Sequence, residues 1–193
     1  TGSFVSTKML GRTTRWAVAR PNGVTGKLPV VVVLHALNTN ERTIFSRKLQ
    51  MQNVLQKYVD DGNPPFALAA VDGAVNYWHR RLDGADSGAM VLDEFLPMLA
   101  SNTELNLSTE RIGFYGWSMG GYGAIHLALR HPDRVVGLFF FNCGTHGVGA
   151  RWRDPAQINE IWYQTFHQMP FAPAIVGASR ESCRAYFRHF LTH

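Results

Sequence analysis

Short apolar runs alternate along the chain with segments in which apolar residues recur at helical spacing. Residues 29–34 include four consecutive valines, and residues 66–71 and 135–141 are almost entirely apolar. Runs of this length without alternation are typical of strands that are buried on both faces of a parallel sheet. Shorter strand patterns occur at 15–20 and 111–117. Together these segments predict a sheet that is covered by helices on both sides.

The segments between these strands repeat their apolar positions with a period near 3.6, which indicates amphipathic helices. We expect helices at about 43–59, with Asn40 as the N-cap, at 87–99 and at 120–130. Pro97 should kink or shorten the second helix, because proline has no amide hydrogen to donate. This alternation of strands and helices predicts an α/β fold with a mainly parallel sheet.

The pattern weakens after residue 141. Helices are expected at about 156–167 and 180–191, and no further strand is predicted. Cys143 and Cys183 can pair or remain free, because two cysteines do not define a disulfide framework.

Composition supports one globular domain over residues 1–193. Hydrophobic residues make up 46% of the chain and charged residues 17%, which excludes an intrinsically disordered protein. No apolar run approaches the roughly 18 residues that a transmembrane helix needs. The net charge of +5 comes from scattered residues, so a nucleic-acid partner is not expected.

A candidate nucleophile lies between the strand at 111–117 and the helix that follows it. Gly116-Trp117-Ser118-Met119-Gly120 fits the pattern G-x-S-x-G, which marks a tight turn that holds a serine above the sheet. At the N-terminus of the helix, the helix dipole and free N–H groups favour a developing negative charge. The alternative is a glycine-rich turn without chemistry.

Two backbone N–H groups are candidates for an oxyanion hole. One belongs to Met119, directly after the serine, and the other to Leu37, in the loop after the valine-rich strand. In this interpretation His35 is a structural residue. The alternative for the loop is a simple entry turn into the next helix.

Several sequence blocks occur in an order that is typical of one superfamily. These blocks are VVVVLHALNTN, FALAAVDG, NYWHRR, GAMVLDEFLPML and RIGFYGWSMGGYGA. Over residues 4–141 the chain resembles the α/β-hydrolase superfamily, and in particular actinobacterial serine esterases of the esterase-D and mycolyltransferase-like type. The resemblance implies a Ser–His–acid triad, an acyl-enzyme intermediate and carboxylic-ester substrates, with no cofactor and no metal.

The resemblance also implies roles for individual residues. Ser118 matches the nucleophile, and Met119 and Leu37 match the backbone donors of the oxyanion hole. The block Tyr77-Trp78-His79 matches a segment close to the site. Its rings either wall the substrate pocket or pack at the base of a loop.

The catalytic base is expected in the loop after residue 141. His146 lies in Gly144-Thr145-His146-Gly147, which looks like the G-x-H loop of the family. His189 and His193 are the alternatives. His126 falls inside the helix predicted after Ser118, and His131 belongs to a surface turn.

The triad acid is not assigned by the sequence. The order in this fold is serine, acid, histidine, and the only carboxylate between Ser118 and His146 is Asp133. Asp133 precedes a strand, whereas triads gather at the carboxyl edge of the sheet. Asp154 follows His146, out of the family order. If His189 is the base instead, the family order admits as the acid Asp154, Glu160 or Glu181. Asp133 and Asp154 therefore remain weak candidates.

The predicted fold is an α/β-hydrolase three-layer sandwich with a mainly parallel sheet, shortened by several tens of residues after its sixth core strand. The expected function is a serine esterase that acts on a small-molecule or lipid ester. The alternatives are acyl transfer to a sugar or lipid hydroxyl and a non-catalytic binding scaffold. The chain begins at Thr1, and the missing initiator Met and the resemblance favour an exported protein.

Overall fold

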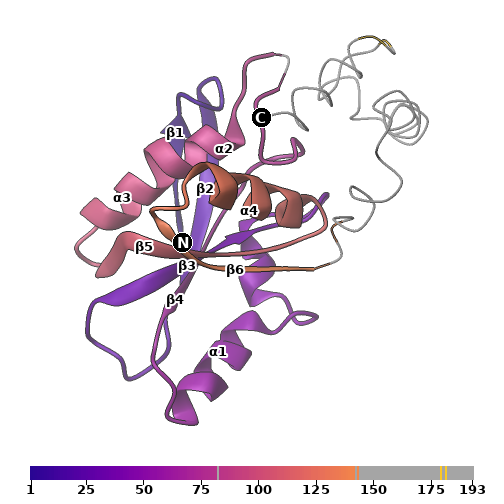
Figure 1. Cartoon of the computed structure of the whole chain (residues 1–193). Coiled ribbons are helices and arrows are strands. Elements are labelled where there is room, and N and C mark those ends of the chain that lie inside the picture. The colour runs from indigo at the N-terminus through magenta and orange to yellow at the C-terminus, as the bar shows by residue number, and fades with distance from the viewer. Residues whose placement is uncertain (82, 142, 144–178, 180, 182–193) are drawn as a thin grey trace.

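A six-stranded sheet forms the centre of the computed structural model, which describes residues 1–81, 83–141, 143, 179 and 181 (Figure 1). In spatial order the strands are β1 (Gly2–Ser6), β2 (Arg12–Ala19), β4 (Ala67–Val71), β3 (Leu28–Leu34), β5 (Leu107–Trp117) and β6 (Val135–Phe141). The pairs β1–β2 and β2–β4 are antiparallel, and β4, β3, β5 and β6 run parallel to one another. The predicted mainly parallel sheet is confirmed.

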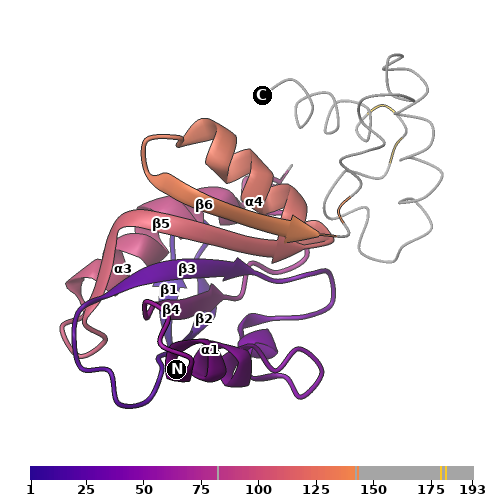
Figure 2. The same cartoon turned by 60° about the horizontal axis from the view of Figure 1, so that its bottom comes forward.

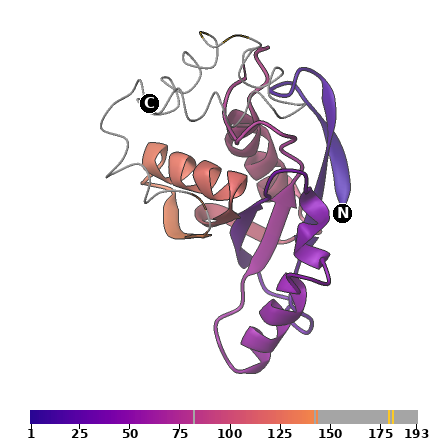
Figure 3. The same ribbon diagram turned by 90° about the vertical axis from the view of Figure 1, so that its right-hand side faces the viewer.

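Helices cover the two faces of the sheet, so the described part of the chain has three layers (Figure 2). On one face lie η1 (Glu41–Phe45) and α1 (Met51–Asp60). On the other lie α2 (Ser87–Met90), η2 (Val91–Phe95), α3 (Leu96–Ser101) and α4 (Met119–Arg130). Figure 3 shows α4 and α1 on opposite sides of the strands.

The valine-rich strand β3 is central because its side chains reach both cores. Val30 and Val32 belong to the larger cluster, with Phe95, Phe114 and other residues of the α2–α4 face. Val33 belongs to the smaller cluster beneath α1, with Leu55. Val31 faces the same side as Val33 but is only partly buried. The expectation of a strand buried on both faces is therefore met.

Two elements differ from the sequence expectation. The hairpin partner β1 was not predicted, because Gly2–Ser6 is mostly exposed and carries little apolar pattern. The expected helix at 43–59 is two helices: a 3-10 helix capped by the Asn40 side chain, and α1. Gln50, in left-handed backbone with φ 49°, separates them. Helical spacing of apolar residues alone does not reveal such a break.

Pro97 lies in the first turn of α3, directly after the π-helical segment η2. Because proline cannot donate a backbone hydrogen bond, a wider turn before it lets the helix continue to Ser101. The segment expected as one helix at 87–99 is thus helical throughout but changes its winding.

The expected helices at 156–167 and 180–191 and the shortening after residue 141 lie outside the described residues, apart from Glu181 in the second helix. A membrane-spanning helix is absent from the described part of the chain.

Candidate active site

Three parallel strands end at the same edge of the sheet and place polar residues there. His35 follows β3, Asp72 follows β4, and Ser118 follows β5. Since β3 lies between β4 and β5, the loop that contains His35 is flanked by the other two. This carboxyl edge is where open α/β sheets hold their ligands.

Ser118 occupies a strained turn between β5 and α4. Its backbone has φ 51° and ψ −122°, a combination that non-glycine residues adopt at a cost of about 1–3 kcal/mol. The turn is held on both sides: the Ser118 N–H donates to the Phe141 carbonyl at 3.2 Å, and the N–H of Gly121 donates to the Ser118 carbonyl at 3.1 Å. Such strain persists where the surrounding structure enforces it, often at active sites.

The two glycines of the turn are required by close packing. A Cβ atom on Gly116 would lie 2.2 Å from the Gly120 carbonyl oxygen. A Cβ atom on Gly120 would lie 1.9 Å from the carbonyl oxygen of Leu34, at the end of β3. Side chains at these positions would prevent the turn from closing against β3. The strand–turn–helix context that G-x-S-x-G requires is therefore present around Ser118.

The loop from His35 to Asn40 is ordered around the carbonyl of Ala36. The Thr39 N–H donates to it at 3.2 Å and the Thr39 hydroxyl at 2.8 Å. Asn38 closes the turn with φ 59°. Among the described residues, no group accepts a hydrogen bond from the Leu37 N–H.

His35 is buried and neutral. The Gly73 N–H donates to its Nε2 at 3.0 Å, so Nδ1 carries the hydrogen and donates to the Ala36 carbonyl at 2.8 Å. Burial lowers the pKa of the imidazole, although the Asp72 carboxylate lies 3.8 Å from Nε2. The expectation of a structural role for His35 fits this geometry.

Asp72 is a buried carboxylate at this edge that the sequence did not single out. It accepts from Arg12 at 3.2 Å and from Arg15 at 3.3 Å on one oxygen, and from the Ala74 N–H at 3.0 Å on the other. Through these contacts Asp72 connects the first half of β2 with the end of β4. The only sequence signal was its place directly after a buried strand.

Trp78 joins three segments at the carboxyl edge. Its side chain is 1% exposed, its indole N–H donates to the His35 carbonyl at 3.2 Å, and its ring lies edge-on to the His35 ring. A Cβ atom on Gly73 or Gly123 would lie 2.4 Å from Trp78. Trp78 therefore packs the 72–86 loop against β3 and α4.

Both sequence neighbours of Trp78 have ring contacts with α4. The ring of Tyr77 lies 6.1 Å from that of Tyr122, which is on α4 one turn after Ser118. Burial raises the pKa of the Tyr77 hydroxyl, so this group remains protonated. His79 is buried, with its ring 5.0 Å from that of His126 on α4.

Among the other residues considered as the catalytic base or acid, those that the structure describes include His126 and Asp133. His126 lies eight residues along α4 from Ser118, or roughly 12 Å at 1.5 Å per residue. Asp133 is exposed in the turn before β6, at the opposite edge of the sheet. His146, Asp154, His189, His193 and Cys183 lie outside the described residues.

Two further features concern metals and thiols. Within residues 1–81 and 83–141 and the few described beyond, no cluster of His, Cys, Asp or Glu could hold a metal ion. Cys143 is buried and packs against Gly121, at 2.7 Å from the position of a Cβ atom there. Burial raises the pKa of its thiol, which makes a reactive thiolate unfavourable.

The mainly parallel sheet, its flanking helices and the strained serine between β5 and α4 define an α/β-hydrolase-type fold. A family model described as "Putative esterase" matches residues 6–162. The chain belongs to this esterase family. Comparison with curated protein sequences gives no match.

Solved structures share this fold at low sequence identity. A ferulic acid esterase superimposes with a TM-score of 0.62 at 20% identity, over 70% of this chain and 56% of that one. The fluorophosphonate-binding serine hydrolase F of Staphylococcus aureus gives 0.63 at 16% identity, over 95% and 69%. An S-formylglutathione hydrolase from Agrobacterium tumefaciens gives 0.63 at 16% identity, over 95% and 66%. This chain spans just over half the length of the ferulic acid esterase.

Proposed function

We propose that this protein is a serine hydrolase that cleaves carboxylic esters through an acyl-enzyme intermediate on Ser118. The observation that carries the proposal is the strained backbone of Ser118, held between β5 and the first residue of α4. A non-catalytic scaffold has no need for this strain, whereas a nucleophile elbow depends on it. The resemblance to known esterases in family and fold supports the same conclusion.

The proposed reaction has two steps. The Ser118 Oγ attacks the acyl carbon, a histidine takes its proton, and that proton passes to the departing alcohol. Water then attacks the acyl-enzyme with the same base, and the carboxylic acid leaves. His146 is our candidate for the base, because it belongs to a G-x-H motif and comes five residues after the end of β6 in the sequence.

The negative charge of each tetrahedral intermediate would be held by backbone N–H groups. Met119 is the first residue of α4, so its N–H has no partner within the helix. We assign the second donor to Leu37, whose N–H has no acceptor among the described residues. Loss of one such donor typically lowers kcat about 10²–10³-fold.

The triad acid has two candidates, Asp133 and Asp154. Asp133 lies at the edge of the sheet opposite to Ser118, so its carboxylate is poorly placed to orient the base. Asp154 is the remaining candidate. Replacing each by Asn and comparing kcat separates the two, since only the triad acid should lower kcat by several orders of magnitude.

Tyr77 and Tyr122 are our candidates for a wall of the substrate pocket. Their rings lie 6.1 Å apart and are tilted by 55°, and Tyr122 is one helical turn after Ser118. Burial raises the pKa values of both hydroxyls. A neutral, aromatic wall suits an uncharged acyl group. A small-molecule or lipid ester is therefore the proposed substrate class.

The test is the substitution Ser118→Ala. We expect the wild-type protein to hydrolyse p-nitrophenyl acetate and to be labelled by a fluorophosphonate, and Ser118→Ala to lose both properties. Ser101→Ala, at the end of α3, is the matched control and should retain both. Equal ester turnover by wild type and Ser118→Ala would contradict the proposal and favour a binding scaffold.

A further inference from the structure

We propose that Thr39 is a positioning residue of the oxyanion hole, which acts through the carbonyl of Ala36 on the N–H of Leu37. This inference rests on the proposed function and deepens it. It assigns a role in the reaction to an exposed side chain that acts through the backbone.

The Ala36 carbonyl is the centre of the loop after β3. It accepts hydrogen bonds from the Thr39 hydroxyl at 2.8 Å, from the Thr39 N–H at 3.2 Å and from His35 Nδ1 at 2.8 Å. A carbonyl that accepts several hydrogen bonds cannot rotate without breaking those hydrogen bonds. The orientation of the peptide between Ala36 and Leu37 is therefore fixed.

The planarity of the peptide bond transmits this restraint to Leu37. The carbonyl of Ala36 and the N–H of Leu37 belong to one peptide unit, and in a trans peptide they point in opposite directions; no peptide of the described chain is cis. Holding the carbonyl on the inside of the loop turns the Leu37 N–H outward. The donors on Ala36 thus set the direction of the N–H that we assign to the oxyanion.

The two side chains on this carbonyl differ in how firmly the fold holds them. His35 is buried, and Gly73 and Trp78 fix its ring and its carbonyl. Thr39 is exposed, and the only side-chain hydrogen bond that its hydroxyl makes among the described residues is the one to Ala36. Removal of His35 would disturb the core, whereas removal of the Thr39 hydroxyl changes the loop alone.

The remaining geometry of the loop favours one conformation. Asn38 supplies the left-handed residue that closes the turn, with φ 59°, and the Leu37 side chain packs on the larger core cluster. Without the hydroxyl, the Thr39 N–H and His35 still hold the carbonyl, but the peptide can tilt. A tilted N–H stabilises a developing oxyanion less well, because hydrogen bonds weaken as they bend.

The test compares Thr39→Val with Thr39→Ser. Valine has nearly the same shape without the hydroxyl, and serine restores the hydroxyl. We expect Thr39→Val to lower kcat for p-nitrophenyl acetate about tenfold, a part of the 10²–10³-fold cost of losing a whole oxyanion donor, with KM within about twofold. Thr39→Ser should recover most of the wild-type kcat.

A matched control removes the same kind of hydrogen bond at another place in the chain. The Ser101 hydroxyl also donates to the carbonyl three residues earlier, Met98, at 3.1 Å, on an exposed helix end. Ser101→Ala should leave kcat and KM unchanged. A lower kcat for this control would show that any such loss affects the fold as a whole, and it would overturn the assignment.

The outcomes separate this inference from the proposed function. If Ser118→Ala is inactive but Thr39→Val keeps the wild-type kcat or changes only KM, the positioning role is overturned and the hydrolase remains. The role also fails if Thr39→Ser is as slow as Thr39→Val. If Ser118→Ala is as active as wild type, the proposed function itself fails.

Discussion

Ser118 shows how neighbouring residues determine the conformation of one position. Its φ of 51° is unfavourable for a residue with a Cβ atom, and the structure around it leaves no alternative. Gly120 contacts the end of β3 so closely that hydrogen is the only side chain that fits. The turn is therefore specified by two glycines and enforced by the neighbouring strand.

Gly120→Ala tests this enforcement. A Cβ atom 1.9 Å from the Leu34 oxygen cannot be accommodated without moving α4 away from β3. We expect a loss of about 3 kcal/mol or more in the free energy of unfolding, measured in urea, since backbone atoms cannot yield as flexible side chains do. Labelling of Ser118 by a fluorophosphonate should fall with it.

Gly26→Ala is the control for this substitution. No atom lies within 4 Å of a Cβ atom at Gly26, and its backbone is not left-handed. Its free energy of unfolding should change by less than about 0.5 kcal/mol. Wild-type stability and labelling in Gly120→Ala would mean that the elbow is not packed against β3 in solution.

At this scale the sequence predicted Ser118 as a candidate nucleophile in a tight turn, but not the contacts that support the turn. G-x-S-x-G is a local pattern, and the preceding strand and following helix gave it its context. The Ala36 carbonyl and its donors have no such signal, because alanine, threonine and histidine at that spacing occur in many loops. Asp72 was missed for the same reason: its arginine partners precede it by 57 and 60 residues.

At the scale of elements, the β1–β2 hairpin is anchored by one carboxylate. Glu94 of η2 accepts hydrogen bonds from the hydroxyl of Ser6, from the N–H and the hydroxyl of Thr7 at 2.8 and 2.6 Å, and from the Lys8 N–H at 3.2 Å. Burial raises the pKa of Glu94, but these hydrogen bonds outweigh that effect and hold it below its usual value. The hairpin turn therefore depends on the ionised form.

Glu94→Gln should destabilise the protein in a pH-dependent way. At pH 7 we expect a loss of about 1–2 kcal/mol in the free energy of unfolding, toward the lower end because the site is partly exposed to solvent. A carboxyl whose pKa is lowered by folding stabilises the native state above its unfolded pKa of about 4.3. That contribution disappears as the pH falls through the folded pKa.

The measurement is urea unfolding of both proteins between pH 7 and pH 3. The difference between wild type and Glu94→Gln should be largest near neutral pH and shrink below about pH 4. Glu104→Gln, on an exposed residue after α3, should show no measurable change. A difference that does not depend on pH would mean that shape, rather than charge, matters at position 94.

The elements that the sequence predicted well are those with strong local patterns. The apolar runs of β3, β4 and β6 fall within a residue or two of their observed ends. β1 was missed because an edge strand needs no continuous apolar pattern; its pairing with β2 decides it. The helix break at Gln50 depends on how η1 and α1 each pack on the sheet.

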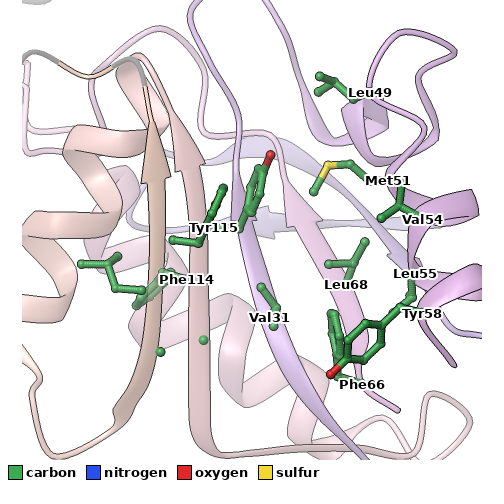
Figure 4. Close-up of a pocket in the computed structure, with 14 residues that line it drawn as sticks. Val31, Leu49, Met51, Val54, Leu55, Tyr58, Phe66, Leu68, Phe114 and Tyr115 are labelled. Atoms are coloured by element: carbon green, nitrogen blue, oxygen red, sulfur yellow. The ribbon is translucent and has the colours of Figure 1, made fainter. Parts of the chain in front are cut away.

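At the scale of the whole molecule, the two faces of the sheet are covered unequally. The larger core cluster lies beneath α2, η2, α3 and α4, and the smaller one beneath η1 and α1. Beside α1, an open groove of about 570 Å³ has an apolar lining that includes Val31 and Tyr115 from the sheet and Leu55 and Tyr58 from α1 (Figure 4). Phe139 of β6 lines it as well and stacks on Tyr115.

This asymmetry predicts that replacing phenylalanine by alanine lowers the free energy of unfolding by different amounts on the two faces of the sheet. Phe95 is fully buried, so Phe95→Ala should lower the free energy of unfolding by about 3–5 kcal/mol. Phe139 is 58% exposed among the described residues, so Phe139→Ala should cost less than about 1 kcal/mol. Denaturant unfolding of the two variants provides the comparison. A similar cost for both would mean that Phe139 is buried in solution by another part of the protein.

The sequence by itself determined the alternation of strands and helices, the mainly parallel sheet and the serine between strand and helix. These features depend on apolar periodicity and on glycine spacing, which are local properties of the chain. Tertiary structure alone decided the tautomer of His35, the contact of Gly120 with Leu34, the anchoring of the hairpin by Glu94 and the restraint on the Ala36 carbonyl. Most of these contacts join residues that are tens of positions apart in the sequence, so they form only when the sheet assembles. The restraint on the Ala36 carbonyl is local, but it includes His35, whose ring is held by a backbone N–H after β4.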